Sequence, residues 1–275
     1  MLEKLKYKNH MNEVFDFGKN GIFVNMNDLH DYEWSVTKRG NRISAFDYTV
    51  SKRKLPVVIV CKTEEEGLAA RNKLMEITEK DVLAMQHGKI IIGDYYFKCF
   101  VTKSQKSDYL TNKRYMQAEL TLTTDFPYWV KETTFTFGKL DGNSDSGQML
   151  DFSFDYPHDY FSTIGHEQIN NTGFVGSNFR MIIYGACTNP VVYINGHKYQ
   201  VNCGVASGEY LTIDSVAKTI ILVKNDGTTV NHFKNRSRDS YVFEKIPAGS
   251  NNLSWDGNFG VDVIMMEERS EPKWT

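Results

Sequence analysis

The sequence has no hydrophobic run long enough to cross a membrane. A spanning helix needs about 18 or more consecutive apolar residues, and no such run occurs anywhere in the chain. The first residues, Met1 to Lys6, also lack the uninterrupted apolar stretch of a signal peptide. We therefore expect a soluble product that is made in a cytoplasm and does not insert into a membrane.

Motifs for metal binding and for common catalytic chemistry are missing as well. The seven histidines occur singly, and the sequence has no His-Glu-x-x-His, no Cys-x-x-Cys and no Gly-x-Ser-x-Gly. The four cysteines lie far apart, which predicts reduced, buried thiols rather than a disulfide framework: Cys61, Cys99, Cys187 and Cys203. We expect no metal, no cofactor, no catalytic residue and no enzymatic activity.

Two acidic stretches imitate functional sites without matching them. Residues 141–147 begin like a calcium loop, but Ser146 stands where the motif needs glycine and Phe152 where it needs glutamate. Asp151, Asp155 and Asp159, with His158, could supply paired carboxylates for glycoside hydrolysis. A spacing of four does not fit one face of a strand, so we predict a polar loop followed by a strand entering a turn.

Overall charge and composition favour a globular protein with protein partners. The net charge is only −2, with 41% hydrophobic and 24% charged residues. Proteins that bind nucleic acid need clustered Lys and Arg side chains to displace counterions from the phosphates. A chain with almost no net charge is a poor candidate, so we expect no specific nucleic-acid partner. The chain has 275 residues, which exceeds the usual size of one domain, about 100 to 200 residues. Two domains are therefore expected.

The first half shows strand signals interrupted by one helix. Asn20-Gly21 predicts a hairpin turn within 17–24, and the apolar run 57–60 predicts a buried strand. Thr63 and Glu66 have the spacing of a capping box and predict a helix over 64–79. Another hairpin is predicted around Gly93-Asp94. We expect a first domain over 1–132, a β-sandwich or barrel with one α-helix.

The second half repeats short strand signals without a long amphipathic helix. Asn195-Gly196 between 191–194 and 199–201 is the clearest hairpin in the chain. Further strands are predicted at 210–213, 219–223, 241–243 and 261–265. Strands with one apolar face must bury it against a second sheet. A second domain over 133–275, an antiparallel β-sandwich, follows from this pattern, with 138–147 as a loop or linker.

Several segments occur in the order found in the distal tail (Dit) proteins of long-tailed phages, the siphophages. In the first half these are the helix start at Thr63, the Gly93-Asp94 hairpin and the closing Asp125-Phe126-Pro127-Tyr128-Trp129. In the second half they are the segments 155–160, 185–190, 194–196, 208–214 and 249–255. Each segment is a short strand-and-turn motif of low specificity, but the segments occur in the family's order over nearly the whole chain. The sequence resembles this family.

The resemblance implies a tail-tube-like first domain and a galectin-like or carbohydrate-module-like second domain. It implies a homohexameric ring at the virion tail tip of a phage or prophage, assembled from chains made in the bacterial cytoplasm. Such a hub joins the tail tube protein to the tail-associated lysin or fibre hub protein and to receptor-binding or baseplate proteins. The function expected from the resemblance is that of a structural, non-enzymatic distal tail protein.

Two sets of residues are candidates for contacts. The basic stretch 38–54 and the polar segment 103–114 are predicted to clasp neighbouring subunits through Lys38, Arg39, Lys52, Arg53, Lys54, Lys103, Lys106, Tyr109 and Arg114. Trp255 is the candidate for stacking on a sugar ring, although core packing is the commoner role of such a residue. A carbohydrate-binding adhesin that uses the second domain is the alternative function, and a glycosidase or peptidoglycan hydrolase is a third.

Overall fold

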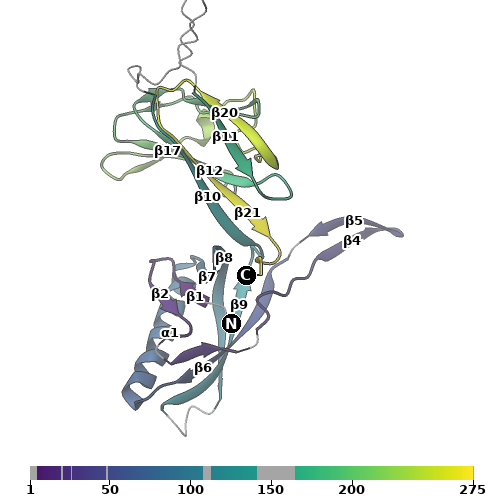
Figure 1. Ribbon diagram of the computed structural model, residues 1–275, viewed down its shortest axis with the longest axis vertical. Coiled ribbons are helices and arrows are strands. Elements are labelled where there is room, and N and C mark those ends of the chain that lie inside the picture. Colours follow the sequence, from purple (N-terminus) through teal and green to yellow (C-terminus); the bar gives the residue numbers. More distant parts are fainter. Residues whose placement is uncertain are drawn as a thin grey trace, which may run out of the picture. The chain divides into compact units, whose positions relative to one another are not determined.

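The computed structural model describes residues 5–19, 21–25, 27–47, 49–107, 113–140 and 165–274. It divides into two compact units, of which unit 1 comprises 1–131 with 268–275 and unit 2 comprises 132–267. Strands β10 (Trp129–Phe137) and β21 (Val261–Arg269) each begin in one unit and end in the other (Figure 1). The described residues are mainly β, as predicted, and hold one α-helix.

Unit 1 is built from two sheets that share one long strand. Its strands are β1 (Leu5–Lys8), β2 (Val14–Asp16), β3 (Ile22–Val24), β4 (Ser35–Arg39), β5 (Arg42–Asp47), β6 (Ser51–Val60), β7 (Gly88–Ile92), β8 (Tyr95–Ser107), β9 (Tyr115–Thr124) and the start of β10. The first part of β8 pairs with β7 and β10, and its second part pairs with β9. The two sheets therefore run β10-β8-β7-β1-β2 and β3-β6-β9-β8. The predicted hairpin around Gly93-Asp94 is present as β7 and β8.

Helix α1 (Glu64–Ala84) packs against β8, β6 and β2 and starts as predicted. The amide of Glu66 donates to Thr63 Oγ1 at 3.2 Å, and Glu66 Oε2 accepts from the Thr63 amide at 3.3 Å. The helix continues beyond the predicted end at residue 79 to a left-handed cap at Met85. Thr78 and Asp81, which are polar, occupy its buried face near the end of the helix. A search for regularly spaced apolar residues therefore does not detect the last turn.

The hairpin predicted over 17–24 is wrong. Strand β2 pairs with β1, whereas β3 pairs with β6 in the other sheet. Gly21 sits where the chain crosses between the sheets, and a Cβ there would lie 2.1 Å from the carbonyl oxygen of Val60. The glycine is required by close approach to β6 at a left-handed φ of +75°, and the strands that it separates do not pair with one another.

A buried polar cluster ties α1 to the start of the chain. Asp81 is 0% exposed, and its carboxylate accepts hydrogen bonds from the Tyr7 hydroxyl and, at 2.9 Å, from the His10 amide. The His10 ring nitrogen Nδ1 lies 2.5 Å from Asp81 Oδ1. Gly88 leaves the space for this cluster, because a Cβ there would lie 2.2 Å from both Asp81 Oδ2 and the Tyr7 hydroxyl. One carboxylate thus joins helix α1 to residues 7–10 at the start of the chain.

Unit 1 should lose stability in alkaline solution through Tyr7. Burial, and next the hydrogen bond to Asp81, raise the pKa of Tyr7 above its ordinary value of 10.0. The folded chain keeps this proton at a pH where the unfolded chain releases it, so the contribution is complete below pH 10 and decreases as the pH rises further. Denaturant unfolding across this range should show a steeper loss for the native chain than for Tyr7→Phe. Parallel pH profiles would contradict the assignment.

Unit 2 is a sandwich of two antiparallel sheets. Its elements are β11 (Gly165–Asn171), β12 (Asn178–Tyr184), β13 (Cys187–Thr188), β14 (Val191–Ile194), β15 (His197–Gln200), β16 (Gly204–Val205), β17 (Tyr210–Asp214), β18 (Thr219–Val223), β19 (Thr229–Asn231), the short 3-10 helix η1 (Phe233–Asn235) and β20 (Gly249–Trp255), together with β21. One sheet has the order β19-β18-β17-β12-β21 and the other β11-β20-β14-β15. The predicted Asn195-Gly196 hairpin is confirmed as β14 and β15.

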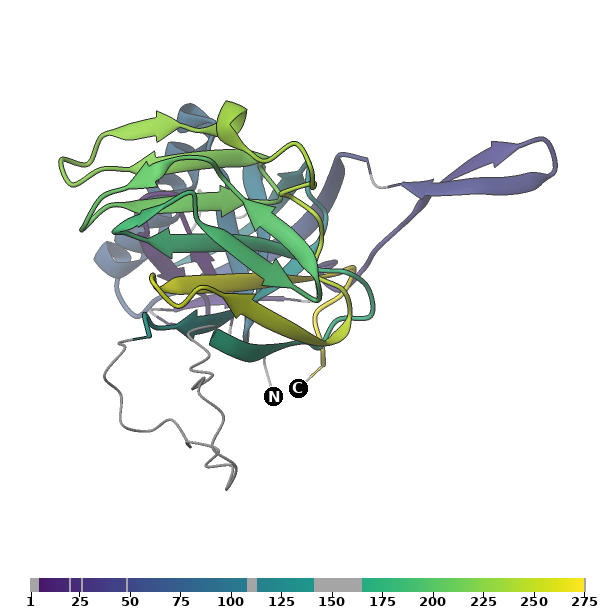
Figure 2. The ribbon, with the colours of Figure 1, turned by 90° about the horizontal axis from the view of Figure 1, so that it is seen from above.

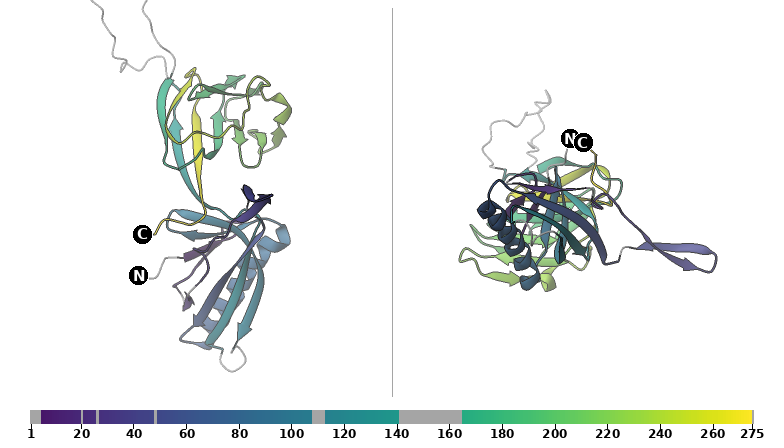
Figure 3. Two further views of the ribbon diagram at one scale, coloured as in Figure 1. Left: turned by 90° about the vertical axis from the view of Figure 1, so that its right-hand side faces the viewer. Right: turned by 90° about the horizontal axis from the view of Figure 1, so that it is seen from below.

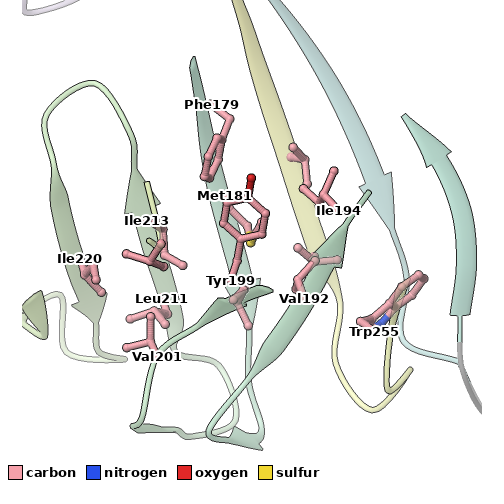
Figure 4. Close-up of a cluster of buried hydrophobic side chains, with 14 of the residues drawn as sticks. Phe179, Met181, Val192, Ile194, Tyr199, Val201, Leu211, Ile213, Ile220 and Trp255 are labelled. Atoms are coloured by element: carbon pink, nitrogen blue, oxygen red, sulfur yellow. The ribbon is translucent and has the colours of Figure 1, made fainter. Parts of the chain in front are cut away.

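The core of unit 2 fills the space between these sheets (Figure 4). Phe179 and Met181 point inward from β12, and Val192 and Ile194 point inward from β14. The strand predicted at 241–243 is wrong. The chain turns there, and the Glu244 amide donates to the Tyr241 carbonyl at 3.1 Å, because Val242 and Phe243 are buried by a turn that folds onto the sandwich rather than by sheet pairing.

The end of the chain returns to unit 1. The predicted division at residue 132 assigned 268–275 to the second domain, but these residues belong to unit 1. Trp274 stacks on His30 with ring centroids 4.0 Å apart, and Glu271 Oε1 lies 3.4 Å from His30 Nδ1. These contacts, which join residues far apart in sequence, are invisible to a search for linker composition.

Candidate functional site

Strands β4 and β5 form an arm that projects from unit 1 (Figure 2). They pair with each other and with no other described strand. The two-residue turn Gly40-Asn41 joins them, with Gly40 at a left-handed φ of +62°. All residues of the two strands are exposed except Ala45, which is half-buried. We call residues 35–47 the arm.

A bulge gives the arm one apolar face. Val36 pairs with Phe46 and Lys38 pairs with Ile43, so two steps along β4 correspond to three along β5. Paired side chains of an antiparallel ladder point to the same side, and every second residue of a strand does too. Val36, Ile43 and Phe46 therefore share a face, on which Lys38 is the one charged residue, and Trp34 extends it with its ring centroid 6.4 Å from that of Phe46. The extra residue of the bulge places Ile43 on this face.

This apolar face lies open to solvent in the single chain. Ile43 and Phe46 are each 57% exposed. An isolated two-stranded hairpin is marginally stable in water at best, because it has no third layer on which to bury its side chains. The arm is therefore built to lie against another surface.

The tip of the arm is basic. Lys38 and Arg39 were predicted as contact residues, and the turn brings Arg42 beside them through the Arg39 and Arg42 pair. Asp47 at the base is the one acidic residue of the arm. Sequence reasoning missed Ile43, although Gly40-Asn41 is a turn signal that points to the hairpin.

Most of the remaining predicted basic residues lie elsewhere, on the outer face of the sheet β6-β9-β8. Lys54 and Lys103 are both register partners of Thr121, so the three residues form a row across the sheet. Lys54 Nζ also lies 3.3 Å from Glu119 Oε1. Lys52 is exposed on the same face of β6, whereas the exposed Lys106 is the register partner of Ala118, which faces the core, and Arg114 is exposed just before β9. Tyr109 lies outside the described residues.

Arg53 does not face a neighbour, contrary to the prediction. It is 5% exposed, and its guanidinium donates to the Leu29 carbonyl and lies 4.4 Å from the centre of the Phe97 ring. On β6 the side chains alternate between core and solvent, and Arg53 takes a core position between Lys52 and Lys54. A run of three basic residues in a strand therefore has its middle member inside.

Trp255 is equally unavailable to a sugar. It is 3% exposed, and its indole N–H donates to the Phe259 carbonyl at 3.0 Å. Figure 4 shows it at the end of the inward row of unit 2. Phe137 packs against it with ring centroids 5.8 Å apart. The structure thus places this residue in the core and removes the glycan contact proposed for it.

A polar hollow of about 650 Å³ opens beside the returning C-terminal segment of unit 1 and is lined by Asn27, His30, Asp31, Tyr32, Glu271 and Trp274.

No group of three or more His, Cys, Asp or Glu side chains in the described part of the chain is placed to hold a metal ion. No described helix is long and apolar enough to span a membrane. The calcium-like stretch 141–147 and the carboxylates Asp151, Asp155 and Asp159 with His158 lie outside the described residues.

No protein-family model matches the sequence, and no curated protein resembles it closely. Solved structures match its fold along the whole length. A chain of the phage P2 baseplate in its activated conformation with Ca has a TM-score of 0.65 at 12% identity, with 99% of this chain and 100% of that chain covered.

Two further structures give the same result. The Dit protein of phage SPP1, described as a paradigm of the hub adsorption apparatus in phages that infect Gram-positive bacteria, has a TM-score of 0.60 at 10% identity, with 98% of this chain and 100% of that chain covered. The phage p2 baseplate with Sr has a TM-score of 0.65 at 12% identity, with 99% and 100% covered. The chain therefore has the Dit fold.

Proposed function

We propose that this chain is a structural distal tail protein of a long-tailed phage or prophage. In this proposal it forms a hexameric hub at the virion tail tip that joins the tail tube to the fibre or lysin hub and to the host-adhesion apparatus. The observation that carries the proposal is the agreement of fold with two phage hub and baseplate proteins over 98–99% of the chain. A partial match confined to one unit would support only a shared module.

The arm supports self-association. A heterologous contact between copies closes into a ring when each copy is rotated by the same fraction of a turn. An arm whose apolar face has no cover in the single chain is suited to such a contact, because burying it on the next copy removes that surface from water. We assign Lys38, which shares the apolar face, to this contact, with Arg39 beside it at the tip of the arm.

The proposed role is that of a scaffold without catalysis. A hub needs broad contact surfaces, and the row of Lys54, Thr121 and Lys103 is a second one, with Lys52 on the same face and the exposed Arg114 just before β9. Partners in the proposal are further copies of the chain, the tail tube protein, the tail-associated lysin or fibre hub protein, and receptor-binding or baseplate proteins. The adhesin alternative loses the residue on which it depended, because Trp255 is buried.

Removing the apolar face of the arm should prevent assembly. Complete burial of a side chain the size of Ile or Phe contributes about 1.5–3 kcal/mol, and about 1.4 kcal/mol corresponds to tenfold in an equilibrium constant. Ile43→Ser with Phe46→Ser should therefore weaken each contact on the order of 100-fold or more. We expect light scattering over a concentration series, with negative-stain images, to show six-fold rings for the native chain and monomers for the variant.

The opposite face of the arm provides the control. Thr37 and Ala45 are register partners on that side, and Thr37→Ser with Ala45→Ser should leave the rings intact. Equal assembly of the two double variants would contradict the role of the apolar face. A native chain that stays monomeric at every concentration would contradict the hub.

A further inference from the structure

The outward face of helix α1 combines exposed apolar and acidic side chains. Glu76, Glu79 and Leu83 follow one another at spacings of three and four, so they share one side of the helix. Leu83 is 79% exposed and the following cap residue Met85 is 80% exposed. We define the helix patch as the exposed residues Leu68, Glu76, Glu79, Val82, Leu83 and Met85.

This patch is not needed for the core of unit 1. The buried side of α1 is formed by other residues, which pack toward the sheets: Gly67, Ala70, Leu74, Ile77, Thr78 and Asp81. Large apolar residues at the end of a helix that already has a buried face expose apolar area without stabilising the single chain. Such a surface is typical of a protein contact.

The helix patch and the arm are complementary in both hydrophobicity and charge. The arm offers the apolar Val36, Ile43 and Phe46 and the basic Lys38, Arg39 and Arg42. The helix patch offers Val82, Leu83 and Met85 together with the carboxylates of Glu76 and Glu79. Contacts between opposite charges around an apolar centre favour this pairing and its register.

Their positions also fit a head-to-tail contact between copies. Figures 1 and 2 and the right-hand view of Figure 3 show α1 and the arm on opposite sides of unit 1. A contact between two different surfaces on opposite sides of a unit propagates from copy to copy and closes when the rotation permits. The arm cannot serve the helix patch of its own chain in this arrangement.

The other broad exposed surface of unit 1 is less suited to the arm. The outer face of β6-β9-β8 carries Lys52, Lys54 and Lys103. Glu119 is already paired there with Lys54. A basic arm on this surface would bring like charges together, which weakens binding, and the loss is greater the more the charges are removed from water.

We propose that the apolar face of the arm of one copy docks on the helix patch of the next, with Lys38, which shares that face, and Arg42, at the tip beside the turn, meeting Glu76 and Glu79. This inference rests on the proposed hub function and names the surface that completes its ring contact. The helix patch is then the receiving half of the interface, and the arm is the inserting half.

Charge reversal on either half, and on both together, tests the pairing in the full chain. Lys38→Glu with Arg42→Glu should raise the concentration needed for ring assembly by at least about tenfold, because like charges then meet at each contact. Glu76→Lys with Glu79→Lys should do the same. The fourfold variant that carries both pairs should recover rings, because the charges are again opposite. Lys234→Glu with Arg238→Glu, exposed residues of unit 2, is the control with an equal charge change and should assemble as the native chain does.

The outcomes separate this inference from the hub itself. Native-like rings in the variant of α1 would show that another surface receives the arm, while the hub proposal would stand. Failure of the fourfold variant to recover, or dissociation of the unit 2 control, would overturn the direct pairing in the same way. Persistent monomers of the native chain would overturn both proposals. Thermal unfolding of each variant confirms that the comparison is made between folded chains.

Discussion

Replacing Trp255 with alanine should lower the free energy of unfolding of unit 2 by about 3–5 kcal/mol, the usual cost of deleting a large buried aromatic side chain. The cost has three sources. The indole is 3% exposed, so its apolar area returns to water only in the unfolded chain. Its N–H satisfies the Phe259 carbonyl at 3.0 Å, which would otherwise be left without that donor. Phe137 would face a cavity.

Calorimetry of the full chain is the measurement, because two compact units can unfold in separate transitions. Trp255→Ala should shift the transition of unit 2 and leave that of unit 1 in place. Tyr193→Ala is the matched control, since Tyr193 is an aromatic residue of the neighbouring strand β14 that is 41% exposed. Equal effects of the two substitutions would contradict the core role of Trp255.

Substitution of Asp81 by alanine should destabilise unit 1 by about 2–5 kcal/mol, because each donor that loses its acceptor in a buried site costs about 1–3 kcal/mol. The Tyr7 hydroxyl and the His10 amide both donate to this carboxylate. Without it, a buried hydroxyl loses its acceptor and the link between α1 and the start of β1 is broken. The substitution should also leave a small cavity at the end of the helix.

Denaturant unfolding monitored in unit 1 would measure the loss. Glu79→Ala, two residues earlier on the exposed side of the same helix, should change stability by less than about 0.5 kcal/mol, as surface substitutions usually do. If Asp81→Ala were as mild as this control, the buried cluster would not stabilise the fold. The Asp81 variant should also show a smaller alkaline sensitivity from Tyr7, because burial still raises the pKa of Tyr7 but the hydrogen bond to Asp81 no longer does.

The elements that could be predicted from sequence are those specified by local chemistry. The capping box at Thr63 and Glu66 identified the start of α1 because both reciprocal hydrogen bonds are made within one turn. The turn Asn195-Gly196 identified the β14 and β15 hairpin because Asn195 and Gly196 both adopt the positive φ that this turn requires. The order of such segments was enough to anticipate the two-unit β fold.

The arm could not be predicted in the same way because its bulge breaks the period of two. Ile43 and Phe46 are three residues apart, so an alternating pattern assigns them to opposite faces, although the register shows them on one. The apolar face emerges only when β4 and β5 are paired. A sequence pattern also cannot tell which of three consecutive basic residues enters the core, as Arg53 does.

Long-range contacts explain the remaining differences. The pairing of β3 with β6 rather than with β2 depends on how two sheets meet, and the return of 268–275 to unit 1 depends on Trp274 meeting His30. Neither contact has a local signal. The buried position of Trp255 has the same origin, since its face of β20 is covered only after the second sheet is in place.

The carbonyl of Leu29, a residue that precedes the arm, receives two side-chain donors. Arg53, a few residues after the arm, donates to it, and the indole N–H of Trp129 donates to it at 3.1 Å. Leu29 itself is 0% exposed. The chain segments that lead into and out of the arm are therefore joined at one buried atom. Fixing both ends of the arm in this way should reduce the conformational freedom that it loses when it docks.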